Sequence, residues 1–250
     1  LHGEGHSFPT RRSSDLAYQH FDQTAVTAPI TRWSGTVRET ARLPEMFQKA
    51  MRAAYSGRPG VVHLDVPENV MNGPTVWSGC PCPPPQRYRC LEGPVPDTER
   101  MEEVTSFLAG ASRPLIHAGS GVIHARAFEE LKEAAEALQA PVTTSWAARA
   151  AFAETHPLSR PMVYTEELRR LRNEADLVLV LGSRLGETDW WAKPPRWAAP
   201  DTQKMIRVDI DAEMLGLNRP ADSMVHGDVK VFLRETFPIA GAGSAIRPHG

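Results

Sequence analysis

The chain has 250 residues, of which 41% are hydrophobic and 23% are charged, and its formal net charge is -2 at pH 7. No apolar run approaches the roughly 20 residues that a membrane helix needs, and the scattered lysines and arginines form no basic stripe for a nucleic-acid backbone. We therefore expect a cytoplasmic protein of one or two domains, with no nucleic-acid and no membrane partner.

The first residues are expected to lie outside the fold. Residues 6–16 match the translation of a common sequencing-library adapter, so we interpret residues 1–16 as an artefactual leader rather than as a Ser/Arg-rich natural leader or transit peptide. On this interpretation the authentic polypeptide starts near Ala17, and part of the gene product upstream of it is missing.

A short α/β segment comes next. Residues 43–56 predict a helix with Pro44 in its first turn. Its apolar face is expected to comprise Met46, Phe47, Ala50, Met51 and Ala54. The β-branched run 61–66, ended by Pro67, predicts a buried strand. Residues 73–96 are rich in proline and glycine and predict an extended linker.

After this linker, helices and strands alternate. We expect helices at 97–109, 125–138, 165–173 and 228–237, and strands at 114–117, 141–144, 177–181 and 204–210. The run 177–181 is apolar throughout, which is typical of a parallel strand covered on both faces. The predicted fold class is therefore α/β: residues 97–238 form a parallel sheet flanked by helices, a nucleotide-binding-like central domain, preceded by a partial α/β domain.

Candidate binding residues follow three of the predicted strands, where ligands bind in such sheets. Gly119 and Gly121 could let the backbone approach a phosphate, although a tight turn is the favoured explanation of a lone Gly-x-Gly. Arg184 could pair with a phosphate or form a surface ion pair. Asp209 and Asp211 could accept ribose hydroxyls.

No motif assigns catalytic residues within the chain. The sequence has no phosphate-binding Gly-x-x-x-x-Gly-Lys loop and no nucleophile elbow, because Ala118 stands two residues before Ser120. The acids lie too late for a nicotinamide dehydrogenase. We expect no metal site, because Cys80, Cys82 and Cys90 lack a fourth cysteine or a nearby histidine.

Several segments together resemble a known family. The close "GRPGVVHLDVPENV" (57–70) resembles the end of the pyrimidine-binding domain in thiamine-diphosphate-dependent enzymes of the acetolactate synthase type, and "AYQHFD" (17–22) resembles a segment upstream of it. Eight further segments follow in the order of that family's central domain: 114–122, 130–131, 140–142, 156–159, 175–178, 181–184, 207–211 and 227–230.

The resemblance implies a three-domain enzyme acting on a 2-oxo acid, with thiamine diphosphate and Mg2+ bound between the subunits of a homodimer or homotetramer. Residues 17–72 would be part of the pyrimidine-binding domain, and 239–250 the start of a linker to a missing pyrophosphate-binding domain. The family's catalytic glutamate and its Gly-Asp-Gly…Asn motif fall outside the chain. Within it, Gln19 and Arg32 would line the substrate channel. We therefore expect an inactive fragment; the alternative is a stand-alone nucleotide-binding or regulatory module without catalysis.

The resemblance also suggests FAD or an adenine nucleotide in the central domain, held by Gly119, Gly121, Arg184, Asp209 and Asp211. However, Ala148 and Ala150 stand where the family has glycines, and 160–165 replaces a glycine-rich region. These side chains would crowd a flavin, so we expect no FAD or only a nucleotide-like ligand. Trp190, Trp191 and Trp197 are expected to pack against another domain or subunit, or alternatively to form a lid.

Overall fold

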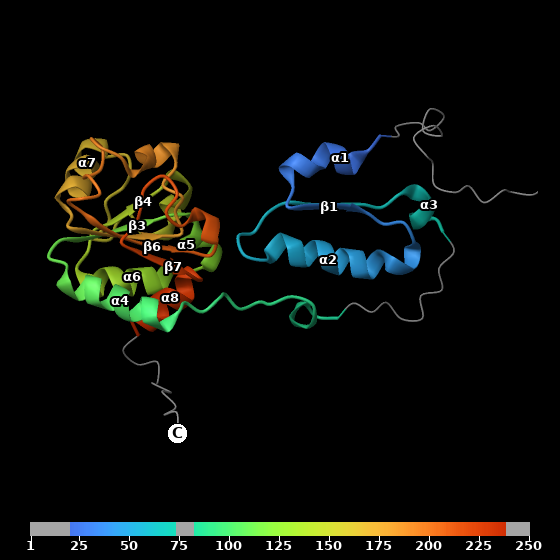
Figure 1. Ribbon diagram of the computed structural model, residues 1–250, viewed down its shortest axis with the longest axis horizontal. Coiled ribbons are helices and arrows are strands. Elements are labelled where there is room, and N and C mark those ends of the chain that lie inside the picture. Colours follow the sequence, from blue (N-terminus) through green and yellow to red (C-terminus); the bar gives the residue numbers. More distant parts are fainter. Residues whose placement is uncertain (1–20, 74–82, 239–250) are drawn as a thin grey trace, which may run out of the picture. The chain divides into compact units, whose positions relative to one another are not determined.

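The computed structural model describes residues 21–73 and 83–238, and the chain divides into two compact units between Leu91 and Glu92 (Figure 1). Gln19, Cys80, Cys82 and the predicted leader lie outside the described residues. Among the described helices, none combines the length and the apolar character needed to span a bilayer.

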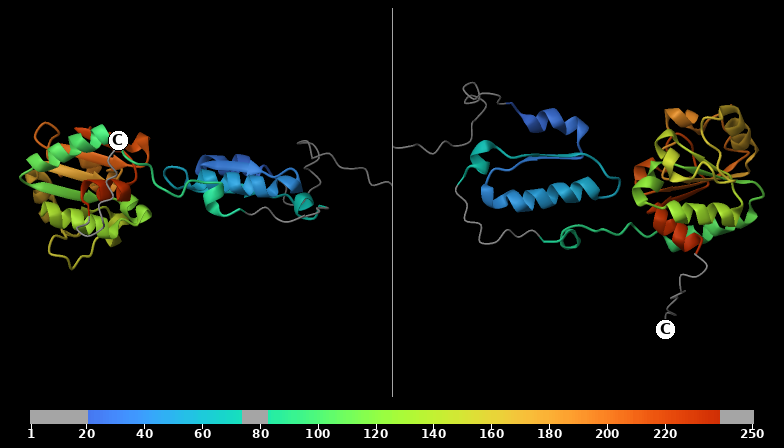
Figure 2. Two further views of the ribbon diagram at one scale, coloured as in Figure 1. Left: turned by 90° about the horizontal axis from the view of Figure 1, so that it is seen from below. Right: turned by 180° about the vertical axis from the view of Figure 1, so that it is seen from behind.

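The first unit is built on two parallel strands. Strand β1 (Trp33–Thr36) pairs with β2 (Val62–Asp65), and Trp33 lies opposite Val62. Helix α1 (Gln23–Thr27) lies on one side of this pair and α2 (Leu43–Tyr55) on the other (Figures 1 and 2). The remaining elements are short: η2 (Ala28–Ile30), η3 (Thr40–Arg42), α3 (Glu68–Met71) and η4 (Pro85–Arg87).

Helix α2 forms close to where its sequence predicts it. Pro44 lies in the first turn of the helix, where its missing backbone N–H costs no helical hydrogen bond. Ala50 is buried. Phe47, which belongs to the predicted apolar face, is 53% exposed. Strand β1 was not predicted, because Trp33-Ser-Gly-Thr36 shows neither an apolar run nor a clear alternation.

The second unit contains a five-stranded sheet in which every strand is parallel. Its order is β4 (Val142–Thr144), β3 (Pro114–Ala118), β5 (Leu177–Leu181), β6 (Lys204–Asp209) and β7 (Ser223–His226). This arrangement confirms the predicted α/β class. Strand β7 was not predicted; it is an edge strand in which buried Ser223 and Val225 alternate with exposed neighbours.

Five α-helices accompany these strands. Helix α4 (Thr98–Gly110) precedes β3, and α8 (Val229–Thr236) follows β7. Helices α5 (Ser120–Ala125) and α6 (Phe128–Leu138) connect β3 to β4, and α7 (Thr165–Glu174) lies between β4 and β5. Three 3-10 helices complete the unit: η5 (Trp146–Ala151), η6 (Glu187–Ala192) and η7 (Ala212–Met214). The predicted continuous helix 125–138 was wrong. Arg126 adopts a left-handed conformation (φ 52°) that ends α5, and α6 begins only at Phe128.

The two faces of the sheet are covered differently. Helices α4, α6 and α8 lie on one side, and α7 lies on the other (Figure 1). Side chains from α4, α5, α6, α8 and η5 join Ile116, Leu179 and Val208 of the strands in one apolar cluster. The opposite face carries a smaller apolar cluster that includes Leu115, Val178 and Trp197. We call these the helical face and the α7 face.

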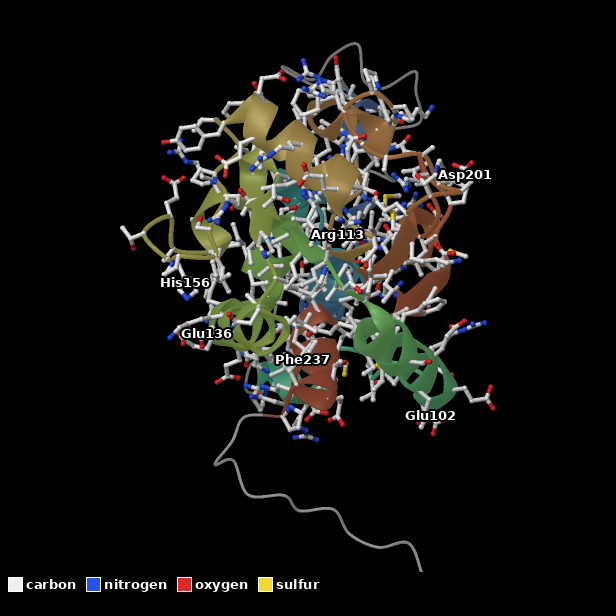
Figure 3. The ribbon with its side chains drawn as sticks, turned by 90° about the vertical axis from the view of Figure 1, so that its left-hand side faces the viewer. Glu102, Arg113, Glu136, His156, Asp201 and Phe237 are labelled. Carbon is white, nitrogen blue, oxygen red and sulfur yellow. The ribbon has the colours of Figure 1, made fainter. Side chains whose placement is uncertain are left out.

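Some details of the second unit are visible from its side. Figure 3 shows Glu102 on the outward side of α4, and His156 near Glu136 at the surface, where the His156 Nε2 atom lies 3.1 Å from the Glu136 carboxylate.

At the start of α8 the Asp228 side chain accepts hydrogen bonds from the backbone of Lys230 and Val231. The Asp228 amide donates to the Pro94 carbonyl at 3.0 Å, so the last residues of the Pro/Gly-rich stretch pack on this unit.

Candidate functional site

The sheet brings the predicted binding residues of the second unit to one edge. Strands β3, β5 and β6 are parallel neighbours, so their carboxyl ends meet. Gly119 and Gly121 follow β3, Arg184 follows β5, and Asp209 and Asp211 end and follow β6. We call this the carboxyl edge, which is where ligands bind in parallel sheets.

The two glycines at this edge allow two loops to pack closely. A Cβ atom placed on Gly119 would lie 2.2 Å from the Gly182 carbonyl oxygen, and one on Gly121 would lie 2.6 Å from the Gly182 Cα atom. Gly182 itself has a φ of +57°, a conformation that favours glycine. The glycines are therefore required by the crossing of the β3 and β5 loops.

Backbone donors at this crossing bond within the protein. The amide of Gly119 donates to the Leu181 carbonyl at 2.8 Å, and that of Gly121 donates to the Gly182 carbonyl at 3.0 Å. Since an amide proton committed to a carbonyl is not available to a phosphate, these two glycines give shape to the edge without offering free donors.

The charged residues at the edge differ in how accessible they are. Arg184 is exposed, whereas Asp209 is buried and its carboxylate accepts the Asp211 amide at 3.0 Å. Asp211 is half-buried and caps η7 by accepting the Glu213 amide at 3.2 Å. Arg184 and Asp211 are therefore the side chains best placed to contact a polar ligand, and a binding role for the set stays a prediction.

Arg32, predicted to line a substrate channel, is an exposed residue of the first unit. Its guanidinium group donates to the Arg58 carbonyl, and its aliphatic part lies where a Cβ atom on Gly60 would be. This arrangement ties Arg32 to the 57–60 turn. Gln19, its predicted companion, lies outside the described residues.

The structure changes the argument against a flavin. Ala148 is fully buried in the apolar cluster of the helical face, so its methyl group cannot crowd a ligand, and the expectation that it would was wrong. Ala150 is exposed in the same 3-10 helix. At the loop crossing, protein backbone lies beside Gly119 and Gly121, and the absence of FAD stays a prediction.

No group of three or more His, Cys, Asp or Glu side chains that could hold a metal ion occurs within residues 21–73 and 83–238. Cys90 is exposed and is not in a disulfide. The described part of the chain thus offers no metal centre of its own.

A buried polar cluster on the α7 face was missed by the sequence analysis. His117 of β3 lies in one row with Thr143 of β4 and Arg207 of β6, and all three side chains are buried. The Nε2 atom of His117 lies 3.4 Å from the carboxylate of Asp189 in η6, which is also buried. Trp197 packs edge-on against the His117 ring, with 5.4 Å between the ring centroids.

This cluster shifts the titration of its charged members. Burial raises the pKa of Asp189, but His117, Arg172 and a hydrogen bond from Ser183 outweigh that effect and hold it below its usual value. Burial lowers the pKa of Arg172 to about 10, against the opposing attraction of Asp189. A histidine inside an apolar strand was the signal that could have pointed to this cluster.

Trp197 also corrects an expectation. It was predicted to pack against another domain or subunit, but it is fully buried within the second unit, and its indole N–H donates to the Asp189 carbonyl at 2.8 Å. Trp191 is 44% exposed.

A fully parallel sheet with helices on both faces (Figure 1) defines an α/β domain of the doubly wound kind. The family model described as "Thiamine pyrophosphate enzyme, central domain" matches residues 101–236, more than half of the chain. The chain therefore belongs to the thiamine pyrophosphate enzyme family, and this match confirms the resemblance.

Named relatives agree with this assignment. The chain is 33% identical to an acetolactate synthase from Mycobacterium bovis over 227 residues, which cover 88% of the chain and 35% of that protein. It is 30% identical to the acetolactate synthase isozyme 1 large subunit from Escherichia coli, over 93% of the chain and 40% of that protein. The chain thus spans less than half the length of these relatives.

A solved structure supports the fold. The chain superposes on benzoylformate decarboxylase from Polynucleobacter necessarius with a TM-score of 0.69 and 22% sequence identity, covering 91% of the chain and 42% of that protein. At this identity the likeness speaks for the fold alone.

Proposed function

We propose that this chain is a part of a thiamine-diphosphate-dependent enzyme that decarboxylates a 2-oxo acid and ligates or releases the product, as an acetolactate synthase does. The observation that carries the proposal is the family match over 101–236, joined to the identity with acetolactate synthases that extends through the first unit. The parent enzyme would use Mg2+ with the cofactor and would assemble as a homodimer or homotetramer.

In such an enzyme the bound cofactor would supply the nucleophilic carbon for reaction with the 2-oxo acid, and the protein would bind and orient both molecules. The printed sequence contains no Gly-Asp-Gly motif. The described residues include no candidate metal cluster. We infer that the 250-residue polypeptide does not turn over 2-oxo acids by itself and contributes a scaffold. By the family resemblance, Gln19 and Arg32 would line the substrate channel of the parent enzyme.

The test measures carbon dioxide release from pyruvate and other short 2-oxo acids, with saturating thiamine diphosphate and Mg2+. The Escherichia coli acetolactate synthase large subunit is the positive control, and the chain without cofactor is the blank. We expect the chain to match the blank. Cofactor-dependent release above the blank would overturn the proposal that it is inactive as a fragment.

Ligand binding at the carboxyl edge is tested separately by thermal unfolding with FAD and with ADP. We expect no change in Tm with FAD, because residues 160–165 replace the family's glycine-rich region. A shift with ADP that is lost in Arg184→Ala would support a nucleotide at this edge. A shift with FAD would contradict the expectation for the flavin.

A further inference from the structure

The proline-rich stretch between the two units has local structure of its own. Residues 85–87 form the 3-10 helix η4, and the amides of Tyr88 and Arg89 donate to the Pro85 carbonyl at 3.1 and 2.9 Å. Tyr88 and Arg89 are half-buried, although the residues on either side of them are exposed. Two side chains of this stretch therefore pack against the protein. We call residues 84–96 the strap.

The last turn of α2 holds the strap on the first unit. The Arg89 guanidinium lies over the Tyr55 ring, 4.2 Å from its centroid. Arg52, three residues before Tyr55 and on the same side of the helix, donates to the Tyr88 carbonyl at 3.3 Å. The Nε atom of Arg89 is buried and has no hydrogen-bond partner among the described residues. The Tyr55 ring is therefore the main contact of this guanidinium, and we call this the Arg89 anchor.

The other end of the strap packs on the second unit. The Asp228 amide donates to the Pro94 carbonyl at 3.0 Å. A Cβ atom placed on Gly93 would lie 2.3 Å from the Asp228 Cβ atom, and one on Gly227 would lie 2.8 Å from the Pro96 Cγ atom. Pro96 is buried. Backbone and ring atoms thus fit closely against the start of α8, and we call this the Pro94 anchor.

The two anchors differ in how readily they can open. The Pro94 anchor consists of a backbone hydrogen bond and close contacts at two glycines, so it opens only if backbone moves. The Arg89 anchor consists of side-chain contacts at the surface, where the Tyr55 ring is 50% exposed and Arg52 is exposed. A cation-π contact at such a site is weak, so rotation of one side chain can break it.

We propose that the strap is a releasable connection between the two units, and that the stacking of Arg89 on Tyr55 controls its release. With the Arg89 anchor closed, only residues 90–92 lie between the two anchors. With it open, the connection extends back toward α3, which ends at Met71. Because a chain spans at most about 3.5 Å per residue, opening this anchor lengthens the reach of the connection several-fold. This inference does not depend on the activity proposed for the parent enzyme.

Limited digestion of the whole chain with trypsin tests the Arg89 anchor. Trypsin must bind an arginine side chain in its own pocket before it cleaves the bond that follows, so cleavage after Arg89 requires the guanidinium to leave the Tyr55 ring. The early rate is measured by mass spectrometry and divided by the rate for a synthetic peptide of residues 84–96. We expect cleavage after Arg89 to be about fivefold slower in the protein than in the peptide.

Substitutions on α2 separate stacking from other causes of protection. Tyr55→Ala should raise cleavage after Arg89 by about threefold to fivefold, whereas Tyr55→Phe keeps the ring and should keep the protection. Phe47→Ala is the matched control, because Phe47 is an aromatic residue of the same helix with a similar exposed fraction, 53%. Cleavage after exposed Arg38, which follows β1, reports any general loosening of the first unit.

Two results would overturn the Arg89 anchor. One is cleavage after Arg89 in the unaltered protein as fast as in the peptide, which needs no variant to fold. The other is a rate in Tyr55→Ala that equals the rate in the unaltered protein while cleavage after Arg38 is also unchanged.

Hydrogen exchange of single amides tests the Pro94 anchor. Gly93→Ala places a methyl group where the Asp228 Cβ atom lies, so the Asp228 amide should exchange about tenfold faster when its bond to the Pro94 carbonyl is lost. The Gly227 amide donates to the Asp209 carbonyl and should keep its rate, which makes it the internal reference. An Asp228 amide that exchanges equally fast in both proteins would show that the strap is not fixed at this end.

Discussion

The two faces of the five-stranded sheet are stabilised in different ways. The helical face buries an apolar cluster contributed by α4, α5, α6, α8 and η5. The α7 face buries His117, Asp189 and three arginines, Arg172, Arg207 and Arg219, beneath a segment with little regular structure. Apolar packing acts at any pH, whereas a buried charge cluster is favourable only while its members keep their charges and partners.

The buried arginines of the α7 face need hydrogen-bond partners within the protein. Arg219 donates to the carbonyls of Ala192 and Ala198 at 3.2 and 2.8 Å, and Arg207 donates to those of Leu217 and Ser183. Burial lowers the pKa of both groups. Irregular backbone leaves carbonyls without partners, and buried guanidinium groups supply the donors, so the irregular segments on this face are held by side-chain hydrogen bonds.

The largest expected effect lies on the helical face. Phe232 of α8 is fully buried, and Phe232→Ala should reduce the free energy of unfolding by about 3–5 kcal/mol through lost apolar contact and the cavity it leaves. The measurement is urea-induced unfolding followed by circular dichroism, at neutral pH and at mildly acidic pH. Phe237→Ala, at a partly buried position, should cost less. If the loss of unfolding free energy in Phe232→Ala varied with pH, the helical face would not differ from the α7 face in its response to pH.

The α7 face should respond to pH instead. Asp189→Asn removes the carboxylate between His117 and Arg172 and should cost about 3 kcal/mol near neutral pH, as expected when one member of a buried ion pair is lost. The pKa of Asp189 is lower in the folded protein than in the unfolded chain. Its contribution is therefore complete above the unfolded pKa and disappears as the pH falls through the folded pKa.

The two unfolding curves should accordingly converge in acid, below about pH 4, where the unfolded carboxyl is protonated. Asp201→Asn changes an exposed aspartate of the same unit and is the matched control, with no expected pH-dependent difference. A constant difference between wild type and Asp189→Asn down to acid pH would mean that the carboxylate acts through packing rather than through charge.

The sequence predicted the helical face better than the α7 face. The strand 177–181 was placed at its observed bounds, because an uninterrupted β-branched and leucine run has one simple interpretation. Residues 187–197 have no periodicity, and the partners of Asp189 come from β3 and α7, which are far apart in the chain. Pairing between such distant segments leaves no local pattern to detect.

The carboxyl edge was predicted in part, less fully than the helical face and better than the α7 face. Gly119, Arg184 and Asp209 come at the ends of strands predicted to be parallel, which was enough to predict that they lie at one edge, and they do. Periodicity could not show that the glycine amides bond to the neighbouring loop, because that contact depends on the distance between two backbones. For the same reason the orientation of the Ala148 methyl group was not predictable.

A substitution at the crossing of the β3 and β5 loops should have a smaller effect on the free energy of unfolding. Gly121→Ala would place a methyl group 2.6 Å from the Gly182 Cα atom, and because backbone must move, we expect a loss of about 1–3 kcal/mol. Gly110→Ala at the end of α4 has open space around the new methyl group and should be neutral or slightly stabilising. Equal free energies of unfolding for the two variants in urea would show that the backbone at the crossing shifts to accommodate the methyl group.

The smallest effect concerns two ion pairs that join α6 to α8 through Glu130. Glu130 is buried, and its carboxylate lies 2.9 Å from Arg234 Nε and 3.4 Å from Lys230 Nζ, both of which reach solvent. Glu130→Gln should cost about 1 kcal/mol or less, because water and salt screen the exposed partners. Glu129→Gln, at an exposed position, is the matched control. The loss should shrink as salt is added, whereas a loss independent of salt would indicate that Glu130 packs as part of the apolar layer and that the helical face is uniform after all.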